Sequence, residues 1–69
     1  MVSIRQLEKL LKPYWIGFGA SSDYTNYNEY RHNNTTARID SNDWFFSNAP
    51  KHNYKKALIK ATEQLRLKT

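Results

Sequence analysis

The sequence contains no cysteine, two glycines, two prolines and a single methionine. Without cysteine the chain can form neither disulfides nor thiolate metal sites, and its two histidines cannot complete a zinc site. The longest stretch without a polar side chain, residues 15–20, is far too short to span a membrane. We therefore expect no metal, no small-molecule cofactor and no membrane contact. Because the first residues lack the apolar core of a signal peptide, we expect a cytoplasmic location.

Acidic residues are scarce in one part of the chain. Residues 1–49 carry five basic and five acidic side chains, whereas residues 50–69 carry six basic side chains against Glu63, so the whole net charge of +5 lies there. The basic residues of this part are Lys51, Lys55, Lys56, Lys60, Arg66 and Lys68. Such one-sided charge indicates a surface for an anionic partner.

A chain of 69 residues predicts a single domain, residues 1–69. Domains of this size bury only about 60% of the surface that the unfolded chain exposes, so their stability is marginal. Ten aromatic residues compensate for the small size, because each large ring can bury about 150–250 Å². We expect a core rich in aromatic side chains.

Two segments near the beginning of the chain have clear patterns. Residues 3–11 predict a helix, because Ser3 and Gln6 have the spacing of a capping box and Pro13 ends the element. Residues 15–20 predict a strand whose two glycines indicate the close approach of a covering helix. Alternation predicts one bulky face and one largely bare face. The bulky face would hold Ile16, Phe18 and Ala20, and the bare face Trp15, Gly17 and Gly19.

The middle of the chain is polar. Residues 21–36 contain no aliphatic residue, and a structureless loop of that length would be unusual in a small domain. We expect this part to extend the preceding strand or to pair with the next one, with a turn near residues 33–34. Residues 35–39 predict a strand, residues 40–43 a turn, and residues 44–46 a short strand that pairs back.

The last part predicts a helix that begins at Pro50 or Asn53 and ends near Leu67. Ile59 and Leu67 fall on its charged side, so either the last turn frays or these residues contact a partner. The predicted fold is α+β: helix, three-stranded antiparallel sheet, helix (αβββα), with both helices on one face of the sheet. The residues expected to be least accessible are Leu7, Leu10, Phe18, Ile39, Leu58, Ala61 and Leu65.

The basic last helix is the first candidate binding surface. Lysines along a helix can neutralise successive phosphates, although a solvated helix face is the simpler interpretation. The candidate phosphate contacts are Lys51, Lys55, Lys56 and Lys60, with Arg31 and Arg38 in a second zone.

The polar middle segment is the second candidate. Tyr24, Tyr27 and Tyr30 recur every three residues beside Arg31, a composition that fits stacking on unpaired bases and equally a protein-contact surface. We assign Tyr27 and Tyr30 to the nucleic-acid contact, and expect at least one of the three rings to belong to the core.

Two further features suggest functions other than nucleic-acid binding. His32 and His52 could act as acid or base in a small ribonuclease, but no spacing rule supports this, and we expect no catalytic residue and no enzyme. Residues 44–46 (Trp-Phe-Phe) place large rings on both faces of a strand, so an exposed aromatic patch would indicate a protein partner or a homodimer.

The order helix, three strands, helix resembles the double-stranded RNA-binding domain over the whole chain. Residues 55–57 (Lys-Lys-Ala), followed by Ala61 and Leu65, are similar to that family's lysine-rich opening of the last helix. The resemblance implies that these lysines contact phosphates across a duplex groove. The family's Gly-Pro-x-His loop has no counterpart here. HicA-type toxins have a similar topology, but their histidine after a Gly-Ser pair is missing from residues 19–22 (Gly-Ala-Ser-Ser).

The sequence thus predicts a small basic nucleic-acid-binding protein of a bacterium, phage or mobile element. The alternative is a protein-binding module, such as a phage-encoded inhibitor of a host factor, and a toxin-type ribonuclease is third.

Overall fold

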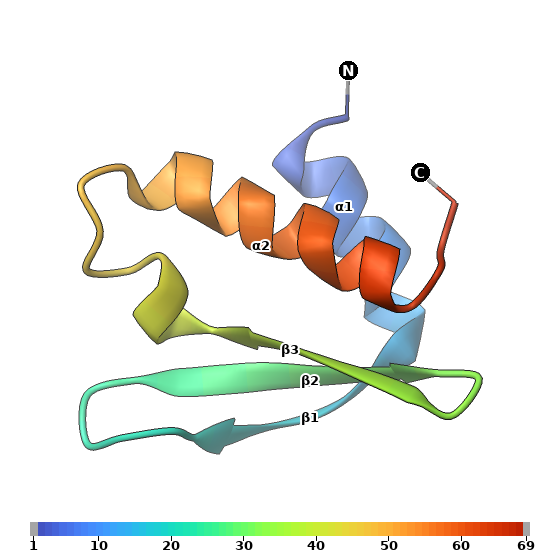
Figure 1. Cartoon of the computed structure of the whole chain (residues 1–69), viewed down its shortest axis with the longest axis horizontal. Coiled ribbons are helices and arrows are strands. Elements are labelled where there is room, and N and C mark those ends of the chain that lie inside the picture. Colours follow the sequence, from blue (N-terminus) through green and yellow to red (C-terminus); the bar gives the residue numbers. More distant parts are fainter. Residues whose placement is uncertain (1, 69) are drawn as a thin grey trace.

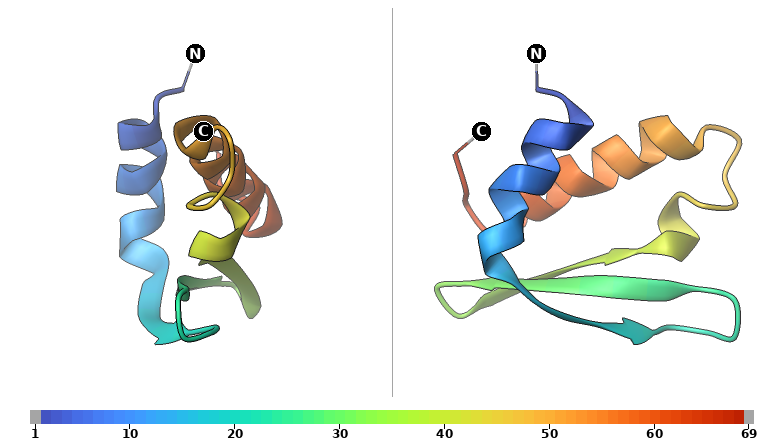
Figure 2. Two further views of the ribbon diagram at one scale, coloured as in Figure 1. Left: turned by 90° about the vertical axis from the view of Figure 1, so that its left-hand side faces the viewer. Right: turned by 180° about the vertical axis from the view of Figure 1, so that it is seen from behind.

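The computed structural model describes residues 2–68, which form two α-helices, two short 3-10 helices and a three-stranded antiparallel sheet. The strands lie in the order β1-β2-β3, with α2 beside β3, and both helices are on the same side of the strands (Figures 1 and 2). The predicted αβββα fold is therefore confirmed. The elements are α1 (Ile4–Leu11), η1 (Lys12–Tyr14), β1 (Trp15–Ala20), β2 (Asn26–His32), β3 (Thr35–Asp40), η2 (Ser41–Asp43) and α2 (Pro50–Gln64).

The first helix begins as its sequence predicts. The Ser3 hydroxyl accepts a hydrogen bond from the Gln6 backbone N–H at 3.2 Å, and the Gln6 side-chain oxygen accepts one from the Ser3 N–H at 2.8 Å. This reciprocal box satisfies two donors that would otherwise lack partners at the helix start. Pro13 then lies in the 3-10 turn that leads into β1.

The core lies between α1, α2 and β3. The buried apolar side chains come from these three elements and from Leu65 at the C-cap of α2, and β1 contributes none to the core within residues 2–68. Phe18 on β1 is 74% exposed, so its predicted burial is wrong, and Leu10 is only half-buried. The physical reason is that the helices cover β3, whereas β1 forms the opposite edge of the sheet (Figure 1). The buried apolar residues are Leu7, Leu11, Ala37, Ile39, Leu58, Ala61 and Leu65.

A β-bulge changes the alternation of side chains along β1. Trp15 pairs with Tyr30, and Gly17 pairs with Glu29, so Ile16 is one residue extra in β1. Because a bulge shifts the pattern by one residue, Trp15 lies on the same face as Phe18, not on the glycine face. The simple alternation predicted for residues 15–20 is wrong at Trp15.

The close approach at Gly19 is made by a tyrosine and not by a helix. A Cβ atom at Gly19 would lie 2.7 Å from the Tyr27 hydroxyl oxygen, so the ring of this cross-strand neighbour occupies the space that a side chain would need. Any larger residue at this position would have to displace the Tyr27 ring.

The middle of the chain forms β2 and a tight hairpin with β3. Asn33 (φ 49°) and Asn34 (φ 65°) form the two-residue turn that was predicted at residues 33–34. Asparagine tolerates this left-handed backbone better than most side chains, because its amide can hydrogen-bond locally. The interpretation that this part pairs with the next strand is confirmed.

The strand predicted for residues 44–46 is wrong. The Ser41 C=O accepts hydrogen bonds from the N–H groups of Trp44 at 3.2 Å and Phe45 at 2.7 Å, so the backbone curls in a helical manner after η2. The sheet has its three strands without this segment, because the polar middle of the chain supplies β2.

The last helix ends earlier than predicted. Arg66 adopts a left-handed backbone (φ 58°), its N–H bonds to the Glu63 C=O at 3.0 Å, and the Leu67 N–H bonds to the Thr62 C=O at 2.9 Å. These two bonds are those of a Schellman motif. The motif turns the chain back, and Leu67 packs against the core instead of extending the charged side.

Candidate nucleic-acid interface

The four candidate lysines of α2 form two pairs on different sides of the helix. At about 100° per residue, Lys56 and Lys60 lie about 40° apart, whereas Lys51 and Lys55 form a second pair at least about 100° away from them. Lys55 is also half-buried, and the other three are exposed. The four candidate phosphate contacts therefore do not lie in one row along the helix, and the two pairs face different directions.

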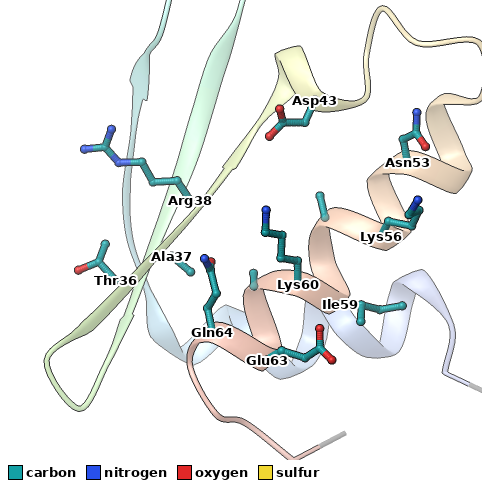
Figure 3. A pocket seen from close by; sticks show the side chains of 12 residues that line it. Thr36, Ala37, Arg38, Asp43, Asn53, Lys56, Ile59, Lys60, Glu63 and Gln64 are labelled. Carbon is teal, nitrogen blue, oxygen red and sulfur yellow. The ribbon is translucent and has the colours of Figure 1, made fainter.

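Lys56 and Lys60 line a groove between α2 and β3, called here the α2–β3 groove, together with Arg38. Its volume is about 810 Å³. Figure 3 shows Lys60 extending from α2 toward β3, while Arg38 extends from β3 across the strands, away from the helix. The carboxylates of Asp43 and Glu63 also line this groove, which leaves it with a small positive excess.

Arg38 is held on the outer face of the sheet, the face away from the helices. Its Nε lies 3.1 Å from the Glu29 carboxylate, and its guanidinium carbon lies 4.4 Å from the centre of the Tyr27 ring. Arg31 follows Tyr27 and Glu29 on the same face of β2 because side chains alternate along a strand. It is exposed and sits opposite Thr36, a residue of the α2–β3 groove. Lys56, Lys60, Arg38 and Arg31 thus form a basic strip from α2 around the β3 edge onto the outer face.

The three tyrosines of the middle segment have three different environments. Tyr24 is 85% exposed in the β1–β2 loop, Tyr27 lies on the outer face over Gly19, and Tyr30 packs against the core. Burial, with a smaller contribution from Glu8, raises the pKa of Tyr30. A spacing of three places Tyr27 and Tyr30 on opposite faces of β2. The prediction that one ring belongs to the core is confirmed, and the rings form no continuous stacking surface.

The histidines are far apart. His32 Nδ1 lies 3.0 Å from the Leu65 C=O at the end of α2, and its ring meets Tyr14 edge-on at 4.8 Å. His52 lies 13 residues before Leu65, about 20 Å away along the helix axis. His32 therefore secures the end of α2 against β2. Within residues 2–68 no group of three or more His, Asp or Glu side chains could hold a metal ion.

A second groove was not anticipated from the sequence. It lies between α1 and the sheet, is called here the α1–sheet groove, and has a volume of about 1310 Å³. Arg5, Lys9 and Lys12 line it, and they follow one another at i, i+4 and i+7, which is one stripe of a helix. The balanced charge of residues 1–49 concealed this stripe, although the helical spacing alone would have revealed it.

The floor of the α1–sheet groove is aromatic. Tyr54 donates a hydrogen bond to the Glu8 carboxylate at 2.6 Å, and its ring centre lies 4.7 Å from that of Trp44. Burial, reinforced by the bond to Glu8, raises the pKa of Tyr54 strongly. Trp15 closes the groove on the β1 side, and its indole N–H donates to the Asn28 side-chain oxygen at 3.0 Å.

Comparison of the chain with protein-family models, with curated proteins and with solved structures finds no match. The resemblance to double-stranded RNA-binding domains and HicA-type toxins stays a prediction from the order of elements. In the described part of the chain, neither helix is long and apolar enough to cross a membrane.

Proposed function

We propose that the protein binds nucleic acid through the basic strip. The observation that carries this proposal is that Lys56 and Lys60 of α2 line the same groove as Arg38 of β3, which is 18 residues away from the nearer lysine in the sequence. Cations from separate elements along one path can follow a phosphate backbone, which supplies affinity without sequence specificity.

The open edge of β3 adds donors to the strip. In a hairpin closed by a two-residue turn, the residues that flank the turn exchange hydrogen bonds, and bonded and non-bonded pairs then alternate. The pairs His32–Thr35 and Tyr30–Ala37 are therefore bonded, and Thr36 and Arg38 direct their backbone groups outward at the edge. Backbone N–H groups are common phosphate contacts.

A protein-binding module is the second candidate. Phe45 and Phe46 are 58% and 62% exposed, and their rings meet edge-on at 5.0 Å in the segment between η2 and α2. Paired exposed rings of this kind are enriched where proteins meet.

The experiment compares two charge-reversal pairs on the same helix. Lys56→Glu with Lys60→Glu removes half of the basic strip, whereas Lys51→Glu with Lys55→Glu makes the same change in charge, at the same spacing, on another side of α2. Binding of a labelled duplex oligonucleotide is measured by fluorescence anisotropy over a range of salt concentrations. Circular dichroism and melting confirm that both variants fold.

We expect the wild-type log K to fall with log salt at a slope of about −3 to −4, for four phosphate contacts. The Lys56/Lys60 variant should lose about two units of that slope, and the Lys51/Lys55 variant should keep it. Equal losses in both variants would mean that net charge alone attracts the duplex, and would contradict the proposed strip.

A further inference from the structure

We infer that the α1–sheet groove is a second nucleic-acid site, one that takes single strands. In this site Arg5, Lys9 and Lys12 hold phosphates, and bases stack on Trp15 and Phe18. It lies on the helix-facing side of β1 and shares no residue with the basic strip, so it does not depend on the proposed function.

The cations of the groove form an ordered row. Arg5, Lys9 and Lys12 are exposed and span about 10 Å of helix axis, at 1.5 Å per residue. Among the described residues that line the groove, Glu8 is the carboxylate that faces these three cations. Its hydrogen bond from Tyr54 ties it to the floor, so the groove keeps a positive excess for an anionic chain.

The aromatic faces stand beside this row because of the bulge in β1. In a regular strand Trp15, three residues before Phe18, would lie on the outer face, but the bulge, in which Ile16 is the extra residue, places it on the face of Phe18. The bond from the Trp15 indole to Asn28 fixes the ring, and Asn28 is the direct cross-strand neighbour of Phe18. Two rings on one face of a strand, one of them held in place, form a stacking surface.

Folding does not account for these exposed side chains. Trp15, Ile16 and Phe18 are 47%, 53% and 74% exposed, although each could bury a large apolar area. Trp15 and Phe18 share one face of this edge strand, and exposed apolar patches commonly mark a binding site.

A row of cations beside exposed aromatic rings favours single-stranded nucleic acid over a duplex. In a duplex the faces of the bases are already stacked, whereas the unpaired bases of a single strand are free to stack on aromatic rings while cations follow the backbone. The volume of about 1310 Å³ exceeds that of a typical small-molecule pocket of about 300–1,000 Å³, which fits an extended ligand. An acidic peptide would use the cations but would not require the flat rings.

The test uses a labelled oligothymidylate and compares Phe18→Ser with Phe46→Ser. Both side chains are largely exposed, so neither change should affect folding. Phe18 borders the groove because it pairs with Asn28, which lines it, whereas Phe46 lies in the segment between η2 and α2. Stacking on Phe18 predicts a loss of affinity of about 5- to 150-fold in the first variant and less than about twofold in the second. The oligonucleotide should also quench tryptophan fluorescence in the wild type, and Trp15→Phe should abolish that quenching.

The cation row is tested by the triple change of Arg5, Lys9 and Lys12 to Gln. Its log K against log salt on oligothymidylate should be shallower by about two units. Undiminished binding by Phe18→Ser, or displacement by polyglutamate as effectively as by unlabelled oligothymidylate, would overturn the inference. The duplex assay with the Lys56/Lys60 variant reports on the basic strip separately, because its variants leave this groove intact.

Discussion

Leu58 and Ile59 are neighbours on α2 with opposite environments, and truncating each to alanine tests the packing of the whole domain. Leu58 is fully buried among α1, β3 and the rest of α2, while Ile59 is 36% exposed. Leu→Ala changes at fully buried sites cost about 2.7–5.0 kcal/mol, the removed methyl groups and the resulting cavity both contributing. A domain of 69 residues has a total stability of about 3–10 kcal/mol at 0.05–0.15 kcal/mol per residue. Leu58→Ala should therefore remove a third or more of it.

Both variants are measured by circular dichroism, in urea denaturation with linear extrapolation to water and in thermal melting. Leu58→Ala should lower the melting temperature by at least about 10 °C, since each kcal/mol shifts a domain of this size by about 4–8 °C. Ile59→Ala should change stability by less than about 1 kcal/mol, because alanine favours the helix and the lost burial is partial. A cost for Ile59→Ala equal to that of Leu58→Ala, and dependent on protein concentration, would refute this reasoning and indicate that the outer side of α2 is a subunit interface.

Two further predictions concern Tyr54, near the start of α2, and Arg66, just after its end. Burial and the hydrogen bond to Glu8 raise the pKa of Tyr54 in the folded state above its unfolded value of about 10. The neutral phenol therefore contributes stability that is fully present below about pH 10 and is lost as the pH rises from there through the folded-state pKa. The free energy of unfolding should therefore fall above about pH 10, and fall less steeply in Tyr54→Phe, as measured by urea titrations at several pH values; equal slopes would contradict the assignment. Arg66→Gly should raise the free energy of unfolding by about 0.5–1 kcal/mol, because glycine adopts the left-handed backbone of this position (φ 58°) without steric cost. Thermal melting checks this, and a lower melting temperature would show that the Arg66 side chain makes a compensating contact.

The sequence predicted the elements whose signals are local. The capping box at Ser3, the stop at Pro13 and the turn at residues 33–34 depend on neighbours within a few positions, and all three are present. The strand predicted at residues 44–46 failed because bulky aromatic composition resembles a strand, while the hydrogen bonds to Ser41 close a turn. Composition does not reveal which backbone donors find a nearby acceptor.

The candidate site was harder to predict because it depends on relations between elements. Helical spacing alone separates the α2 lysines into two pairs, but nothing local joins Lys60 to Arg38. The bulge at Ile16 is likewise invisible in a pattern that alternates regularly, so the placement of Trp15 beside Phe18 emerges only from the register with β2. The stripe on α1 is visible in the helical spacing of Arg5, Lys9 and Lys12, but the acidic residues elsewhere in residues 1–49 cancel it in the net charge of that part.

The core is shared between the first and the last helix, and this has a consequence during synthesis. Of the seven buried apolar residues, two are on α1 and three belong to α2 or its C-cap, and the Tyr54–Glu8 bond joins positions 46 residues apart. A nascent chain that has emerged only as far as β3 can close its hairpin but has nothing to cover Leu7, Leu11 or Ile39. At about 5–20 residues per second, the ribosome needs a few seconds more to deliver α2. Folding is therefore a late event in the life of the growing chain, and the interval before it is when its apolar faces are open to chaperones or to aggregation.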